Sequence, residues 1–277
     1  MYLRWKTTIT ITLIMEDLTT KVTEEDLNHG LNDKFGVVYS RDGKRLLKCE
    51  KRGIVNYEIK KGTEIICDSA FDSYPTLETI IFPDTVVAIG KDAFTNCDSL
   101  QQVKLSQNLV TIGNCAFCWC ASLKEMILPN SVIEIGECTF KLCESMKQLV
   151  ISNSVKQIGG ETFADCYSLH EIVIPNSVKR LEPHSFYSCE NLQQITIPNS
   201  VTYIGADAFG NCDLQQIVFE GIVKHIDNDA FEGNHIKRII IPNGTTKHFQ
   251  KNLPPNLCKK FIILKENSMA NSNDKSE

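Results

Sequence analysis

Phenylalanine recurs along this chain at a fixed interval, and this interval restricts the possible folds more than any other feature. Seven phenylalanines from Phe71 to Phe209 are spaced 23 residues apart, and Phe231 follows after 22. A cysteine column from Cys97 to Cys212 keeps the same phase, three residues after each phenylalanine. A unit this short cannot bury its own apolar side chains, so neighbouring units must stack and share one core. The sequence therefore predicts a solenoid.

Each unit reads as one coil with a short strand and two bends. The pattern L-x-x-I-x-I-P-N-S-V-x-x-I-G-x-x-A-F-x-x-C is clearest from Leu169 to Asn191. Within it, residues 172–174 have strand-forming side chains, and Pro175 to Ser177 have the composition of a turn. We expect the strands of successive coils to form a parallel sheet, with a spine of roughly 35–40 Å for eight strands. The one-residue deletion near Asp213 should tighten a turn without ending the stack.

The unit resembles the BspA-like, Treponema-type leucine-rich repeats of bacteria and protozoa, over about Ile65 to Pro242. This resemblance implies a β-rich, right-handed leucine-rich repeat solenoid with short parallel strands, short helical turns and a cap at each end. Departures are modest, and include Ser106, Ser152 and Glu220 in the proline position.

The flanking segments predict two caps. Asp42-Gly43 between two alternating runs predicts a β-hairpin, and residues 37–47 resemble the hairpin that precedes the repeats in many bacterial family members. Residues 24–32 predict a weakly amphipathic helix, 245–253 a short helix and 261–264 a final strand. The expected organisation is an N-terminal extension that is partly disordered or helical (1–34), a hairpin cap (35–64), the solenoid (65–242), a C-terminal cap (243–264) and a disordered tail (265–277).

Composition and the N-terminal sequence argue against a nucleic-acid partner, a membrane span and a signal peptide. The 29 Lys+Arg against 34 Asp+Glu give a net charge of −5, which argues against nucleic-acid binding. No run of 18 apolar residues exists, so we expect no membrane span. Arg4 and Lys6 precede a Thr-rich segment that lacks a cleavage site, so it is a poor signal peptide. A cytoplasmic location is favoured, with the cell surface or secretion as the alternative, and translation starts at either Met1 or Met15.

The twelve cysteines are candidates for metal binding, disulfide formation or catalysis. Cys115 and Cys118 have C-x-x-C spacing, but the repeat already explains most cysteines nearby, and no second pair is present. In-register stacking orients the ladder thiols poorly for disulfides, so we expect buried free thiols. Neither a catalytic constellation nor a phosphate-binding motif is found. We therefore expect no metal, no cofactor and no enzymatic activity.

The outward face of the strand sheet is the predicted site, because side chains alternate along a strand. A mostly apolar outward column edged by polar side chains is typical of a protein-binding surface, although strand propensity alone also favours β-branched residues. The candidate partner-binding residues are Ile81, Lys104, Glu125, Ile127, Gln148, Val150, Glu171, Val173, Thr196, Val218 and Ile240.

A second outward column is mildly basic towards its C-terminal half, and in a net acidic protein it is interpreted as a solvated face. It comprises Ala88, Thr111, Glu134, Gln157, Arg180, Tyr203 and His225. The chain is predicted to be a non-enzymatic protein-binding scaffold, and the family resemblance suggests adhesion. The alternative is an intracellular structural or regulatory interaction module. The partner's identity, the face that binds it and the oligomeric state stay open.

Overall fold

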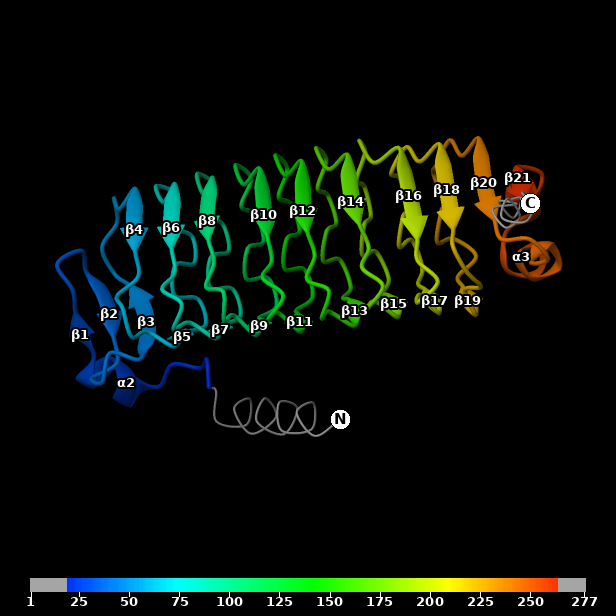
Figure 1. Cartoon of the computed structure of the whole chain (residues 1–277). Coiled ribbons are helices and arrows are strands. Elements are labelled where there is room, and N and C mark those ends of the chain that lie inside the picture. Colours follow the sequence, from blue (N-terminus) through cyan, green and yellow to red (C-terminus); the bar gives the residue numbers. More distant parts are fainter. Residues whose placement is uncertain (1–18, 264–277) are drawn as a thin grey trace, which may run out of the picture.

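The computed structural model describes residues 19–263, which form a solenoid of stacked coils (Figure 1). Each coil carries a longer strand on one side and a two-residue strand on the other, and we call these two arrays the front sheet and the back sheet. The front strands are β4 (Asn56–Glu58), β6 (Thr79–Ile81), β8 (Gln102–Lys104), β10 (Glu125–Ile127), β12 (Gln148–Val150), β14 (Glu171–Val173), β16 (Gln194–Ile197), β18 (Gln216–Phe219), β20 (Arg238–Ile241) and β21 (Phe261–Ile263). The back strands are β5 (Ile65–Ile66), β7 (Ala88–Ile89), β9 (Thr111–Ile112), β11 (Glu134–Ile135), β13 (Gln157–Ile158), β15 (Arg180–Leu181), β17 (Tyr203–Ile204) and β19 (His225–Ile226).

Parallel pairing follows the repeat, which confirms the predicted coil length. Glu125 pairs with Gln148, and Gln148 with Glu171, so equivalent residues of successive coils lie side by side. The shorter coil keeps this register, because Thr196 still pairs with Val218. The deletion is absorbed in the turn at Asp213, whose φ is 56°.

The core is a ladder of phenylalanine rings flanked by a ladder of thiols. Adjacent rings from Phe71 to Phe231 stack with centroids 5.1–5.8 Å apart. The six cysteines of the column, here called the thiol ladder, are fully buried. Each thiol donates a hydrogen bond to a phenylalanine carbonyl of the preceding coil, as Cys143 does to Phe117 at 3.2 Å. Stacking thus buries the apolar column and also satisfies the polar groups beside it.

The segments expected to be short helical turns contain no helix within the described solenoid. They are series of single hydrogen-bonded turns, in which most coils have two residues with positive φ. Cys138 (φ 55°) and Leu142 (φ 60°) are one such pair. Left-handed residues interrupt a right-handed helix, so the chain turns repeatedly here.

The sheets are interrupted at three places. In the front sheet, β8 is not hydrogen-bonded to β10 and β14 is not hydrogen-bonded to β16, and in the back sheet β11 is not hydrogen-bonded to β13. We call these interruptions seams. At each seam the opposite sheet remains paired, as β15 and β17 do behind the seam between β14 and β16. At each seam the strand hydrogen bonds are therefore missing on one side of the stack only.

The N-terminal cap contains the predicted hairpin, formed by β2 (Val37–Tyr39) and β3 (Arg45–Cys49). The expected helix is shorter: α2 spans Glu24–His29, and β1 (Leu31–Asn32) then pairs antiparallel with β2. Because α2 buries no side chain, it is held by polar contacts, chiefly the 2.7 Å ion pair of Asp26 and Arg45. Strand β4 already pairs in parallel with β6, so the parallel stack begins within the segment predicted as a cap.

At the other end, the expected helix and strand are both present. Helix α3 (Thr246–Asn252) buries Phe249, a short helix α4 (Pro255–Cys258) follows, and β21 pairs in parallel with β20. Within residues 19–263, no helix has the length and apolar character needed to cross a bilayer. The candidate signal segment and the predicted tail lie outside the described residues.

Candidate protein-binding face

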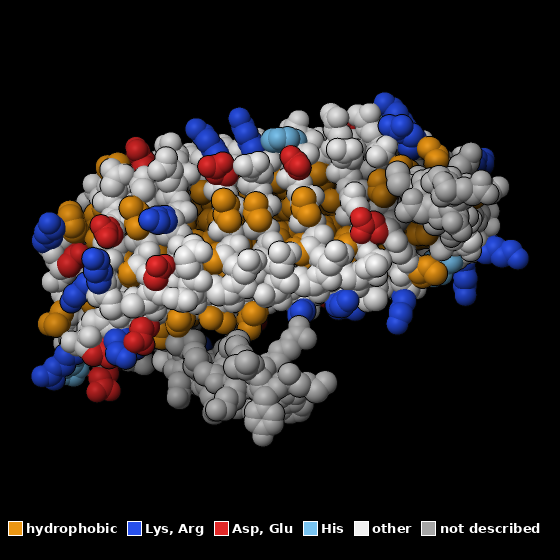
Figure 2. All heavy atoms as spheres, viewed as in Figure 1, with side chains coloured by type: hydrophobic (Ala, Val, Ile, Leu, Met, Phe, Trp, Pro, Cys, Tyr) orange, Lys and Arg blue, Asp and Glu red, His pale blue; other side chains and the backbone are white. Residues whose placement is uncertain are grey.

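The front sheet presents a short, exposed apolar stripe. Ile127, Val150 and Val173 lie on the adjacent strands β10, β12 and β14, in register, with exposed fractions of 72%, 53% and 72%. Their strand neighbours Met126 and Leu149 point the opposite way and are buried. The predicted alternation is therefore confirmed, and we call the three exposed residues the apolar stripe. Figure 2 shows hydrophobic side chains gathered along this face.

The column is less uniform towards its ends. Lys104 and Thr196 are exposed but polar, whereas Ile81, Val218 and Ile240 are half-buried. Their half-buried side chains offer less apolar surface to a partner than the stripe does.

A polar rim borders the stripe on the side where the strands begin. Glu125, Gln148 and Glu171 are all exposed there. The Gln148 amide nitrogen lies 3.5 Å from the Glu125 carboxylate, so successive coils contact each other weakly along the rim. An apolar centre with a hydrated polar border matches the general anatomy of a protein interface.

Two grooves on the front sheet coincide with its seams. A groove of roughly 550 Å³ lies over the seam between β8 and β10, where Lys104 and Ile127 line it. A second groove of roughly 650 Å³ lies over the seam between β14 and β16, and Val173, Thr196 and Val218 are among its lining residues. The apolar stripe thus extends from one groove to the other.

In the second outward column, three neighbouring side chains interact with one another. The guanidinium of Arg180 lies 4.0 Å from the ring centroid of Tyr203, and that ring stacks on His225 at 5.4 Å. The same residues bond the carboxylates of Glu182 and Asp227. These contacts engage the polar groups of Arg180, Tyr203 and His225.

Ala88 does not belong to this exposed column, because it is buried. Beside it, Val22, Val38 and Leu47 of the N-terminal cap pack around Ile65, which pairs with Ala88.

The cysteines form no metal site within residues 19–263, and all twelve are free. Cys115 and Cys138 are half-buried in adjacent coils, and the buried Cys118 follows three residues after Cys115. Burial raises the pKa of Cys118 to about 12 and that of Cys138 to about 11. A thiol that stays protonated is a poor nucleophile.

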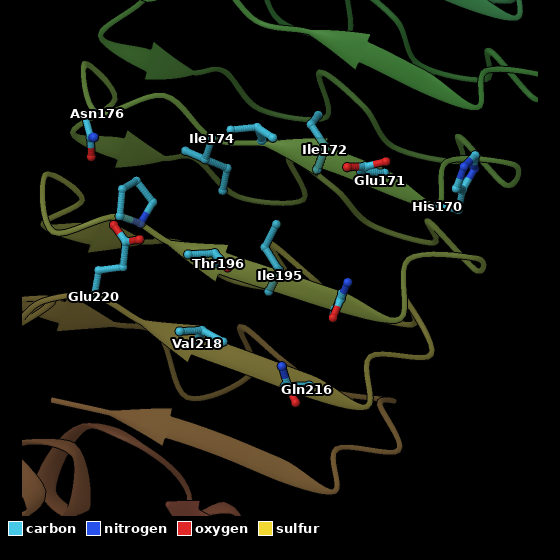
Figure 3. Close-up of a pocket in the computed structure, with 13 residues that line it drawn as sticks. His170, Glu171, Ile172, Ile174, Asn176, Ile195, Thr196, Gln216, Val218 and Glu220 are labelled. Carbon is cyan, nitrogen blue, oxygen red and sulfur yellow. The ribbon is translucent and has the colours of Figure 1, made fainter. Parts of the chain in front are cut away.

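Only Glu171, Val173, Thr196 and Val218 of the larger groove were predicted as site residues, and two of the others are polar residues at its far end. Asn176 and Glu220 lie where the front strands end, across the groove from Glu171 (Figure 3). Glu220 did carry a signal in the sequence, since it replaces the proline of the repeat with a charged side chain.

Comparison with known proteins agrees with this architecture. The sequence model of the BspA type leucine-rich repeat region matches residues 64–191 and 156–270, with six copies of the repeat. No curated protein matches the chain significantly.

Several solved structures share the fold. A leucine-rich repeat protein of T. pallidum is 26% identical, with a TM-score of 0.56, and the match covers 69% of this chain and 89% of that one. A leucine-rich repeat protein of Eubacterium ventriosum is 18% identical with a TM-score of 0.58, covering 76% and 51% of the two chains. One from Bacteroides ovatus is 22% identical with a TM-score of 0.50, covering 84% and 76%.

Proposed function

Because the chain belongs to the BspA-type leucine-rich repeat family, we propose that it is a non-enzymatic scaffold that binds a protein partner through its front sheet. The apolar stripe is the centre of the proposed interface, and the polar rim is its border. Leucine-rich repeat proteins serve generally as protein-interaction scaffolds, which supports the general role. The choice of the front sheet rests on this chain's own surface.

The observation that carries the proposal is the exposure of Ile127, Val150 and Val173 on three adjacent strands. Strand propensity favours such residues at any single position. However, the equivalent outward positions also hold Lys104 and Thr196, so the fold does not require an apolar side chain there. Three contiguous exposed apolar residues therefore favour a binding role.

The stripe offers enough surface for a useful affinity. Complete burial of a valine or isoleucine side chain contributes roughly 1.5–3 kcal/mol. Three such contacts approach the roughly 8 kcal/mol of a micromolar complex, before the cost of ordering both surfaces is subtracted. The rim would then add specificity more than affinity.

Two biological settings are compatible with this role. The resemblance to surface members of the family favours adhesion. The free state of all twelve cysteines favours a reducing compartment, and hence an intracellular structural or regulatory module. Fractionation of the native cell separates them, because adhesion requires the protein on the cell surface.

A comparative pull-down tests the binding face. The baits are the wild-type chain, Val150→Lys and Gln157→Lys. Gln157 is an exposed residue of β13 in the back sheet. A partner that binds the front sheet should be captured by the wild-type chain and by Gln157→Lys but not by Val150→Lys. Equal capture by all three baits would place the binding surface elsewhere. If no partner is captured, the same three proteins are compared for self-association by ultracentrifugation.

A further inference from the structure

The groove at the seam between β14 and β16 has features that point to a ligand of its own. It crosses β14, β16 and β18, and its floor includes Val173, Thr196 and Val218. Figure 3 shows Glu171 and Glu220 on opposite sides, with Thr196 and Val218 between them. The groove thus joins a floor of β-branched side chains to carboxylates at two ends.

Polar groups at this seam lack their usual partners. The two strands that flank it are not joined by a hydrogen-bonded ladder, unlike β12 with β14 or β16 with β18.

The charge of the groove is negative. Glu171 and Glu220 are exposed, and neither forms an ion pair within residues 19–263. No lysine or arginine lines the groove, and His170 at its edge is its single histidine. Two uncompensated carboxylates at opposite ends therefore favour a ligand with two positive charges.

Strand geometry sets the spacing of those charges. Glu171 and Glu220 are two strands apart across the sheet and about four residues apart along it, which corresponds to roughly 16 Å. In an extended peptide, residues i and i+4 project to the same side about 13 Å apart, and lysine side chains are long enough to reach the remaining distance. The residue midway between them faces the same way, over the β-branched floor.

We infer that this groove binds an extended peptide segment with two basic residues four positions apart and a β-branched residue midway between them. Glu171 and Glu220 hold the two basic side chains, and Val173, Thr196 and Val218 hold the central residue. This inference rests on the proposed function, since it names the class of partner for the same face.

Fluorescence anisotropy with the full chain tests the inference. The probe is a labelled peptide Ser-Lys-Thr-Ile-Thr-Lys-Ser, and two comparison peptides carry Gln or Glu in place of both lysines. The lysine peptide should bind most tightly, and its affinity should fall as salt is raised. Glu171→Gln and Glu220→Gln should each weaken it about threefold, and the double variant about tenfold, as expected for exposed ion pairs.

The double variant Glu190→Gln/Glu232→Gln is the matched control, because it removes two exposed carboxylates from other parts of the coils. It should leave the affinity unchanged. Equal binding of all three peptides, or no effect of the groove variants, would overturn the inference. Neither result would affect the proposed function, which is tested separately by Val150→Lys.

Discussion

Truncation of one ring in the phenylalanine ladder tests the physical basis of the fold. Phe163 is fully buried, and its ring lies 5.7 Å from that of Phe140 and 5.1 Å from that of Phe186. Replacement of a buried phenylalanine by alanine costs roughly 3–5 kcal/mol, depending on how far the cavity collapses. Collapse is restricted here, because backbone hydrogen bonds fix the coils on both sides: Phe163 donates to Ser185 at 2.8 Å and Phe140 to Thr162 at 2.9 Å.

We therefore expect Phe163→Ala to lower the free energy of unfolding by about 4–5 kcal/mol, in the upper part of that range. Equilibrium urea denaturation followed by circular dichroism measures this loss. Phe163→Leu is the matched control, since it keeps an apolar side chain and should cost clearly less. A loss below about 1 kcal/mol for Phe163→Ala would mean that the ring is not part of a rigid core, and the coil register would be wrong.

Two further predictions concern the thiols and the N-terminal cap. The thiol ladder should not react with a thiol reagent at pH 8 while folded, because all six thiols are fully buried and burial raises the pKa of Cys97 to about 12 and those of Cys120, Cys143, Cys166 and Cys189 above their ordinary value. All six should react in denaturant without reductant, and disulfide-linked peptides or stoichiometric zinc would contradict this. In the cap, burial acts against ionisation of Asp26, but hydrogen bonds from Thr23 and Arg45 hold its pKa below the ordinary value. Its stabilising contribution is therefore present above about pH 4 and is lost as the pH falls further. Asp26→Asn should unfold more easily than wild type at pH 7, by about 1 kcal/mol or less, and the difference should close near pH 2; a difference independent of pH would contradict this reasoning.

The stacked core could be predicted from sequence because each column has one physical role. A phenylalanine every 23 residues can be buried only if successive coils lie in register, so Phe71 to Phe231 define the stack. The alternation within each strand then places Val150 outward and Leu149 inward without further information.

Other features depend on small differences between individual coils, which the shared repeat pattern does not show. The seam between β14 and β16 has no obvious marker in the sequence, and the groove above it was not predicted. Ala88 was predicted to be exposed because its column is exposed elsewhere, but it is buried at the end of the back sheet that adjoins the N-terminal cap. Glu220 was noted as a departure from the repeat, although only the folded chain places it opposite Glu171.

The most direct test of the binding face is the affinity of a recovered partner for wild type, Val150→Lys and Gln157→Lys, with thermal melting measured in parallel. Val150 is outward and exposed, so its replacement by lysine should leave the melting temperature unchanged. An unpaired ammonium in the middle of the interface should remove at least the roughly 1.5–3 kcal/mol of one buried side chain, which weakens binding about tenfold or more. Gln157→Lys should bind as wild type does. Unchanged affinity and melting for Val150→Lys would contradict binding through the front sheet, and a melting temperature several degrees lower would contradict the outward placement of Val150.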